Sequence, residues 1–391
     1  MHALDGIRVV DFTTMWNGPY ATLLLSDMGA DVLKVEPPDG DPWRRSIGGF
    51  LGCNRGKRSI SLDLKKPEAK EVVRQLIARA DVVAENARWG VWHKLGFDYD
   101  SVTKIKPDII YLSALGHGST GPLSSRPAFD PVIQCRSGQM ANQGGLGEAP
   151  VYHAIAINDC AGPMLGAYAV VLALLVRART GKGQHIETSL TNAAAAMQAG
   201  QFIDYPGMEH IYPGKPDMKG MSATWRLYQA GDGRWVMVLC PSEEHWRKLC
   251  QTLGLPALIA DARFETTGKR AENDEALGEI LTVAFRGKPA AEWIAALQQA
   301  QVPAALSQTY IEVLSDPHVM ANDLFDNKPH RMFGDTRAVG VTPRFSEMTG
   351  VIGHPTPLLG EHTRDVLSGL GYGDTRIDEL EAGNIAFQAK F

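Results

Sequence analysis

The chain has 391 residues, of which 44% are hydrophobic and 21% are charged, and its net charge is −5 with no long block of one sign. This length exceeds the roughly 250 to 300 residues at which a single core stops growing, so two domains are expected, and the charge pattern argues against a nucleic-acid or membrane-surface binder. The five cysteines contain no CxxC pair, which favours reduced thiols in a cytoplasmic protein over a zinc site or a disulfide framework.

Short β-branched runs alternate with helical periods from the N-terminus onward. In chain order the segments are "IRVVDF", "GPYATLLLSDMGA", "DVLKVEPP", "SISLDL", "PEAKEVVRQLIARA", "DVVAEN" and "DIIYLSAL". This alternation predicts an α/β domain with a parallel sheet. Ligands of such sheets bind outside the carboxyl ends of the strands, so "DFTTMWNGP", "AENARWG" and "SALGHGSTGP" are candidate binding loops.

Two segments match patterns whose usual meaning does not fit here. "GHGSTG" fits the dinucleotide pattern GxGxxG, but Pro122 and "LSSRP" follow where that motif needs a helix N-terminus, so nicotinamide binding is not predicted. The apolar run from Cys160 to Val176 is just shorter than the roughly 18 to 20 residues that cross a bilayer. Because it contains Gly162 and Pro163 and stands alone, we expect a buried helix and no membrane span.

The composition changes after residue 206. Residues 207–224 are rich in Gly, Pro and charge and are predicted to be a linker between the first domain, residues 1–206, and a small domain, residues 225–326. In the small domain "WRLYQAGDGRWVMVLC" predicts a hairpin, several helical segments follow, and "SDPHVM" is interpreted as a turn. Residues 327–391 are rich in Pro and Gly and are predicted to return to the first domain, ending in a helix.

A carboxylate interrupts the apolar segment "AIAINDCAGP", where the long helix begins. Asn158 or Asp159 fits a helix N-cap, and the residues alone leave open whether Asp159 also has a chemical role. Cys160 has no His/Asn pair placed to activate it, so a buried structural thiol is favoured over a nucleophile.

The order of motifs along nearly the whole chain resembles that of the class III coenzyme A transferases. This family includes formyl-CoA transferase and carnitine CoA-transferase, and the α-methylacyl-CoA racemases are relatives. The motifs that carry the resemblance include "LDGIRVVDFTTMWNGPYATLLLSDMGADVLKVEPPDGDPWR", "NRGKRSISLDLKKPEAKEVVRQLIARADVVAENARWG", "IYLSALGHGSTGP", "RARTGKGQHIETSL" and "LGEHTRDVL". The resemblance implies a large Rossmann-like domain built from both chain ends, a smaller α+β domain, and an interlocked homodimer.

The resemblance also implies an activity: transfer of coenzyme A (CoA) from an acyl-CoA thioester to a carboxylic acid. Asp159 matches the family's nucleophile, which forms a mixed anhydride and then an aspartyl-CoA thioester. CoA and acyl-CoA are then substrates, and no further cofactor, metal, nucleic acid or membrane is expected. The glycine-rich loop that closes over the intermediate in formyl-CoA transferase has no counterpart between residues 221 and 241.

Two alternatives remain open: an acyl-CoA racemase or epimerase, and a CoA-binding protein without turnover. The racemases carry a Gly-His-Asp triplet whose histidine moves a proton. This chain reads Ala128-Phe129-Asp130 at that position, and phenylalanine cannot act as an acid or base. The intact Asp159 argues against a protein without turnover.

The resemblance assigns a set of CoA-binding residues at the strand ends. They are Met15, Trp16, Leu62, Lys65, Asn86, Ala87, Arg88, Lys94 and Leu95. Trp16 replaces a glutamine of formyl-CoA transferase, and Lys94 replaces an arginine, which keeps the charge but loses the bidentate fork. Pro37 stands where formyl-CoA transferase has a phosphate-binding arginine, so that contact is expected to be weaker or to come from elsewhere, with Arg44 and Arg58 as candidates.

Overall fold

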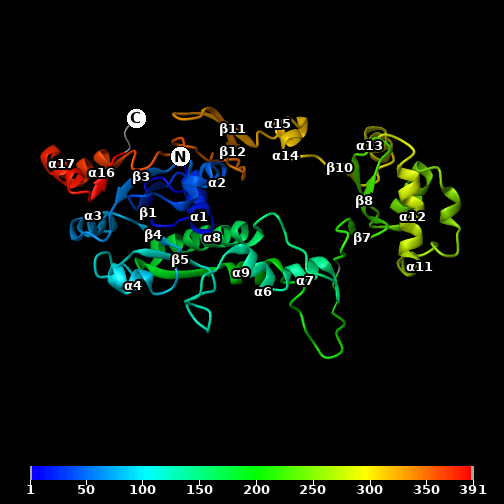
Figure 1. Cartoon of the computed structure of the whole chain (residues 1–391), viewed down its shortest axis with the longest axis horizontal. Helices are drawn as coiled ribbons and strands as arrows, with labels where there is room; N and C mark the ends of the chain where they lie inside the picture. Colours follow the sequence, from blue (N-terminus) through cyan, green and yellow to red (C-terminus); the bar gives the residue numbers. More distant parts are fainter. Residues whose placement is uncertain (1, 211, 213, 389–391) are drawn as a thin grey trace. The chain divides into compact units, whose positions relative to one another are not determined.

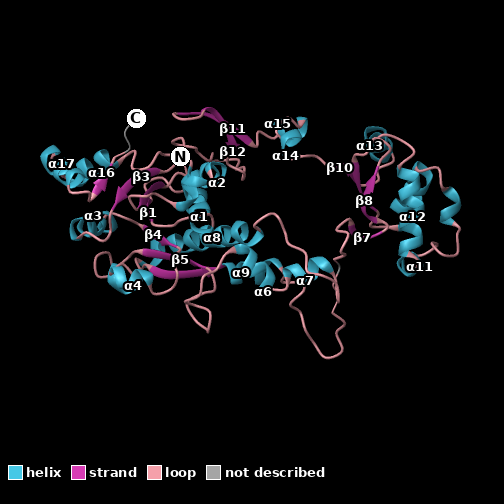
Figure 2. Cartoon of the chain, viewed as in Figure 1, coloured by secondary structure: helices cyan, strands magenta, loops and turns pink. Residues whose placement is uncertain are grey.

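The computed structural model describes residues 2–210, 212 and 214–388 (Figures 1 and 2). Its contacts divide the chain into two compact units, each built from separate stretches of sequence. The first unit comprises Met1–Ser137, His153–Pro206 and Asn322–Phe391, and the second comprises Gly138–Tyr152 and Gly207–Ala321.

A single sheet with the order β13-β3-β2-β1-β4-β5-β6 organises the first unit. Its strands are β1 (Arg8–Asp11), β2 (Asp31–Glu36), β3 (Arg58–Leu62), β4 (Val82–Glu85), β5 (Ile110–Leu115), β6 (Gln184–Ser189) and β13 (Ala386–Phe387). All neighbours pair in parallel except β13, which is antiparallel to β3. The predicted parallel α/β domain built from both chain ends is therefore confirmed. In this Rossmann-like order the topological switch point lies between β1 and β4.

Helices cover both faces of this sheet. One face packs on α1 (Asn17–Asp27) and α8 (Ile157–Thr180), and the other packs on α3 (Pro67–Ala78), α16 (Thr363–Leu370) and α17 (Asp374–Ala382). The remaining elements of the unit are η1 (Pro42–Arg45), α2 (Ile47–Asn54), α4 (Val91–Leu95), α5 (Tyr99–Val102), α6 (Asp130–Arg136), α9 (Leu190–Met197), and an antiparallel hairpin of β11 (Phe325–His330) and β12 (Gly334–Val339). This hairpin is not expected from the Pro- and Gly-rich sequence of the tail.

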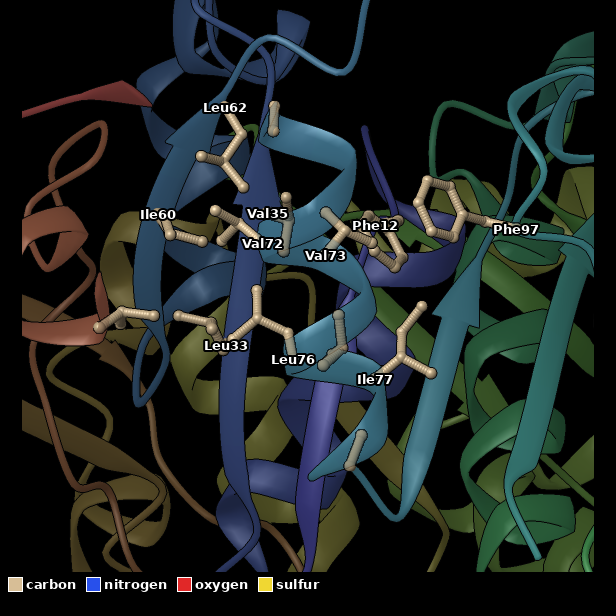
Figure 3. Close-up of a cluster of buried hydrophobic side chains, with 14 of the residues drawn as sticks. Phe12, Leu33, Val35, Ile60, Leu62, Val72, Val73, Leu76, Ile77 and Phe97 are labelled. Carbon is tan, nitrogen blue, oxygen red and sulfur yellow. The ribbon is translucent and has the colours of Figure 1, made fainter. Parts of the chain in front are cut away.

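Helix α3 shows how the sequence pattern builds the core. Its apolar side chains recur every three or four residues, so Val72, Val73, Leu76 and Ile77 fall on one buried face. Figure 3 shows these side chains facing others from the strands of the sheet, among them Leu33. Each such burial contributes roughly 1.5 to 3 kcal/mol, which fixes the strands whose carboxyl ends carry the candidate site.

The apolar helix α8 is buried on one face only. Gly162, Gly166 and Val170 lie on its buried face, where a Cβ on Gly166 would meet Ala21 in α1 at 3.6 Å and Leu112 in β5 at 3.5 Å. The opposite face is exposed and includes Tyr168 at 64% exposure. Within the part of the chain that the structure describes, α8 is the one helix long and apolar enough to cross a membrane by length and composition.

The second unit is built around an antiparallel sheet of order β10-β9-β8-β7. Its elements are α7 (Gln139–Gly144), β7 (Gly220–Ser222), β8 (Trp225–Gln229), β9 (Trp235–Leu239), α10 (Glu243–Thr252), η2 (Pro256–Ile259), α11 (Thr267–Glu272), α12 (Asp274–Phe285), α13 (Ala290–Gln299), β10 (Ala304–Leu306), α14 (Tyr310–Val313) and α15 (Pro317–Ala321). Strands β8 and β9 confirm the predicted hairpin, and Gly233 adopts the positive φ of 81° that its turn requires.

One local expectation in this unit is wrong. The segment "SDPHVM", interpreted as a turn, contains the short helix α15. The carboxylate of Asp316 accepts the backbone N–H groups of His318 and Val319. An aspartate cap followed by a proline at the first helical position is a helix-start signal as well as a turn signal.

Candidate active site

Asp159 is the third residue of α8, and its carboxylate is partly buried. Burial, followed by the charge of Asp130, raises the pKa of this carboxyl from 3.8 to about 7. Among the residues that the structure describes, none forms a hydrogen bond with this carboxylate. The interpretation of Asn158 or Asp159 as the helix N-cap is wrong, because the N-cap is Ala156 and no side chain caps the helix there. Asp159 is thus an uncompensated carboxylate.

Asp130, the first residue of α6, anchors the chain that leads into α8. It is 1% exposed, and its carboxylate accepts the backbone N–H of Asn158 at 3.0 Å and the side-chain N–H of Gln134 at 2.7 Å. Gln134 in turn accepts the N–H of His153 at 3.1 Å. These bonds fix the start of α8 and place a second acidic group near Asp159. No sequence signal assigns Asp130 to the site, because its place beside α8 depends on the fold.

The start of α8 lies against the start of α1. A side chain on Gly162 would place its Cβ 2.7 Å from Oδ1 of Asn17, the first residue of α1. The side-chain N–H of Asn17 donates to the carbonyl of Ala114 at 3.0 Å, which fixes Asn17 against the end of β5. The close approach that only glycine permits therefore brings the turn that carries Asp159 to the start of α1, beside the carboxyl end of β5.

The loops after β1 and β4 flank the switch point and are joined by side-chain bonds. Asn86 accepts the N–H of Thr14 at 2.9 Å and donates to the carbonyl of Thr14 at 2.7 Å. Met15, next along, has a φ of 66°. Trp16 packs near Tyr20 and Trp43, with ring centroids 5.9 and 6.0 Å away.

The loop after β4 is also fixed by its own strand end. Ala87 donates its backbone N–H to the carboxylate of Glu85 at 2.8 Å. Burial raises the pKa of Glu85 to about 7. Because both Asn86 and Ala87 are tied down in this way, the backbone that leads to Arg88 has little freedom.

The remaining predicted CoA-binding residues fall into two groups. Lys65, Arg88 and Lys94 are exposed at the carboxyl ends of β3 and β4 and, within the described ranges, none of them forms an ion pair. They therefore offer free positive charge at one edge of the sheet. In contrast, the Leu62 side chain is fully buried in the core and Leu95 packs against the same core, so Leu62 can meet a ligand only through its backbone.

The two arginines named as candidates for the phosphate contact, given a proline at position 37, both have carboxylate partners. Arg44 binds Glu36 through two hydrogen bonds of 2.7 and 2.6 Å and also donates to the carbonyl of Pro357. Arg58 reaches back to Asp31, the first residue of β2, through bonds of 3.0 and 2.7 Å. A phosphate would have to compete with these carboxylates for either guanidinium group, so a phosphate contact by Arg44 or Arg58 stays a prediction.

Other chemistry at the site is disfavoured by the geometry. Burial, then the charges of Asp159 and Asp130, raises the pKa of the Cys160 thiol, which opposes thiolate formation. The Phe129 side chain is 58% exposed and has no ionisable group. After β5, the segment "GHGSTG" continues as turns and bends until α6. No cluster of three or more His, Cys, Asp or Glu residues suited to a metal occurs among residues 2–210, 212 and 214–388.

Comparisons with known proteins agree with this arrangement. The family model described as CoA-transferase family III matches residues 4–363. Succinyl-CoA:glutarate CoA-transferase of Mus musculus is 31% identical over 99% of this chain and 91% of that protein. Acetyl-CoA:oxalate CoA-transferase of Acetobacter aceti is 33% identical over 82% of this chain and 84% of that protein. The crystal structure of a CaiB/BaiF family protein from Brucella suis superposes with a TM-score of 0.85 at 32% identity, covering 94% of this chain and 99% of that one.

Proposed function

The chain belongs to CoA-transferase family III and is a CoA-transferase, and on that premise we propose that it transfers CoA between carboxylic acids through covalent intermediates on Asp159. The observation that carries this proposal is the Asp159 carboxylate itself. It is partly buried, lacks a hydrogen-bond partner in the described part of the chain, and has a pKa raised to about 7 by burial and by Asp130. A weakly solvated carboxylate of raised pKa is a better nucleophile than an exposed one.

The reaction conserves the thioester bond energy in four exchanges. The Asp159 carboxylate attacks the thioester carbonyl and the C–S bond breaks. CoA departs as a thiolate, and the acyl group is left joined to Asp159 as a mixed anhydride. The thiolate then attacks the aspartyl carbonyl, which expels the donor acid as its carboxylate and gives an aspartyl-CoA thioester. The acceptor carboxylate attacks this thioester to give a second anhydride, and the returning thiolate attacks its acyl carbonyl. The acyl-CoA product departs and the Asp159 carboxylate is regenerated without net proton transfer.

The position of Asp159 supports this sequence of steps. The first turn of α8 has backbone N–H groups that are not used within the helix; that of Asn158 donates to Asp130, and the others are available to stabilise negative charge that develops beside them. The exposed cations Lys65, Arg88 and Lys94 lie at the carboxyl ends of β3 and β4, where an α/β sheet binds its ligand. We assign them to the phosphates of CoA.

A trapping experiment tests the covalent role of Asp159. The protein is incubated with succinyl-CoA or acetyl-CoA and with glutarate or oxalate, the acids named for the two relatives, and CoA esters are measured by mass spectrometry. Hydroxylamine is then added, and the peptide that contains Asp159 is expected to carry an aspartyl hydroxamate. An acyl group on Cys160 would instead be released by hydroxylamine and leave the thiol unchanged, so Cys160→Ser serves as the matched control and should still be trapped. Full turnover by Asp159→Ala would refute the proposal.

We further propose that the enzyme acts as a homodimer, of the interlocked kind that the resemblance implies, and not at a membrane. Helix α8 exposes an apolar stripe that includes Met164 at 53%, Tyr168 at 64% and Leu172 at 42% exposure. Stripes of this kind mark interaction surfaces. The other face of α8 packs on α1 and on strand β5 of an open sheet, and open sheets do not lie within the hydrocarbon core of a bilayer. Tyr168→Glu should lower the mass measured by light scattering, whereas Tyr310→Glu, at an 80% exposed position, should not.

A further inference from the structure

The loop from Thr13 to Trp16, which joins β1 to α1, is held at each of its first three residues by a side chain from another strand end. Lys34 in β2 donates to the carbonyl of Thr13 at 2.7 Å. Asn86 after β4 binds both backbone groups of Thr14, at 2.9 and 2.7 Å. Asp41 after β2 accepts the N–H of Met15 at 3.1 Å.

Met15 has the conformation that these bonds enforce. Its φ of 66° lies in the left-handed region, which a long side chain rarely adopts. Such conformations persist only where the surroundings over-determine them, and they concentrate at functional sites. Here the conformation occurs at the carboxyl end of β1, beside the topological switch point of the sheet.

Asp41 is itself fixed by its neighbours. It is 1% exposed, and one carboxylate oxygen pairs with Lys34 at 2.9 Å while the other accepts the N–H groups of Met15 and Trp43. Its own backbone N–H donates to Glu36 at 3.0 Å. The carboxylate therefore joins the loop after β2 to the loop after β1, as Asn86 joins the loop after β4 to it.

We propose that Asp41 and Asn86 are positioning residues for CoA transfer, which hold the backbone of Thr14 and Met15 in the one conformation that presents this loop to the CoA thioester. This proposal rests on the proposed function. It gives Asn86 a different role from the direct CoA contact expected from the resemblance, because the side-chain oxygen and nitrogen are both engaged with Thr14.

Hydrogen exchange of the full-length protein tests whether Asp41 and Asn86 fix the loop, and this measurement does not depend on enzymatic turnover. In Asp41→Ala and in Asn86→Ala, the amides of Thr14 and Met15 should exchange at least tenfold faster than in the wild type. Asp27→Ala is the matched control, because Asp27 is also a buried carboxylate paired with a cation, Arg55, in the same unit. It should lower stability and leave exchange in the loop unchanged. If Asp41→Ala does not fold, Asn86→Ala, which removes a neutral and only partly buried group, carries the same test.

Binding and kinetics then decide whether the loop matters for CoA. Both variants should weaken CoA binding in calorimetry and lower kcat/KM for acyl-CoA at least tenfold. The loss caused by Asp41→Ala should be smaller in a Met15→Gly background, since glycine adopts a positive φ without help. Unchanged loop exchange, or faster exchange with unchanged CoA affinity, would overturn the proposal. If the wild type transfers no CoA between any acids, the proposed function fails, whereas the exchange and calorimetry still judge the loop.

Discussion

Replacing Asp159 by asparagine should make the protein more stable while abolishing turnover. The pKa of this carboxyl is raised from 3.8 to about 7 in the folded protein, so between these values the folded state keeps a proton that the unfolded state has lost. Stability from this group is therefore fully present at low pH and falls as the pH rises to about 7. The stability lost between low pH, where the group is protonated in both states, and high pH, where it is ionised in both, is about 4 kcal/mol as an upper bound.

Chemical unfolding at pH 5 and pH 8 measures this effect. Asparagine has nearly the shape of the protonated acid and no charge to desolvate, so the stability advantage of Asp159→Asn should grow by about 1 to 3 kcal/mol between the two pH values. Asp335→Asn makes the same chemical change at an exposed position in β12 and should change stability by less than about 0.5 kcal/mol at either pH. An advantage that does not depend on pH would show that Asp159 is well solvated or compensated, which would refute the reasoning.

Three further outcomes are expected. Lys94→Ala removes an exposed cation that has no ion-pair partner among the described residues. This change should raise the KM for acyl-CoA about tenfold with little change in kcat, and the effect should shrink at high salt. Unchanged CoA affinity in calorimetry would exclude the phosphate contact. Gly162→Ala should lower stability by about 1 to 3 kcal/mol and slow turnover, because the new Cβ would lie 2.7 Å from Asn17 Oδ1, and a wild-type melting curve would contradict this. With Phe129 in place of a histidine, no deuterium from heavy water should enter the α-carbon of a 2-methylacyl-CoA during turnover, and incorporation at the rate of turnover would restore the racemase alternative.

The sequence predicts most of the large domain because local and global signals agree there. The amphipathic pattern of α3 and the short, mainly apolar runs of β2 and β5 each match the element that forms. The β11–β12 hairpin was missed because Pro329 within β11 reads as a strand breaker, although proline is tolerated in a strand without a second neighbour. The exposed face of α8 was missed because composition alone does not distinguish a helix buried on all sides from one buried on one side.

The candidate site was less predictable, since its chemistry depends on contacts between distant segments. Asp159 was assigned through the resemblance. Asp130, whose like charge raises the pKa of Asp159, is 29 residues earlier in the sequence and can be recognised only once α6 packs beside α8. Asn86 was expected to contact CoA, and its bonds to Thr14 depend on β4 lying next to β1 in the sheet. Arg44 and Arg58 looked available because their partners, Glu36 and Asp31, can be identified only from the fold.

The site concentrates several unfavourable features at one edge of the sheet. Asp159 is an uncompensated carboxylate, Asp130 adds a like charge, and Met15 holds a left-handed backbone. A fold selected for stability alone would retain none of these. Their energy is offset by the apolar core of the sheet. If Asp159 is the nucleophile, its poor solvation is what makes it reactive, so substitutions that relieve it should gain stability and lose transfer together.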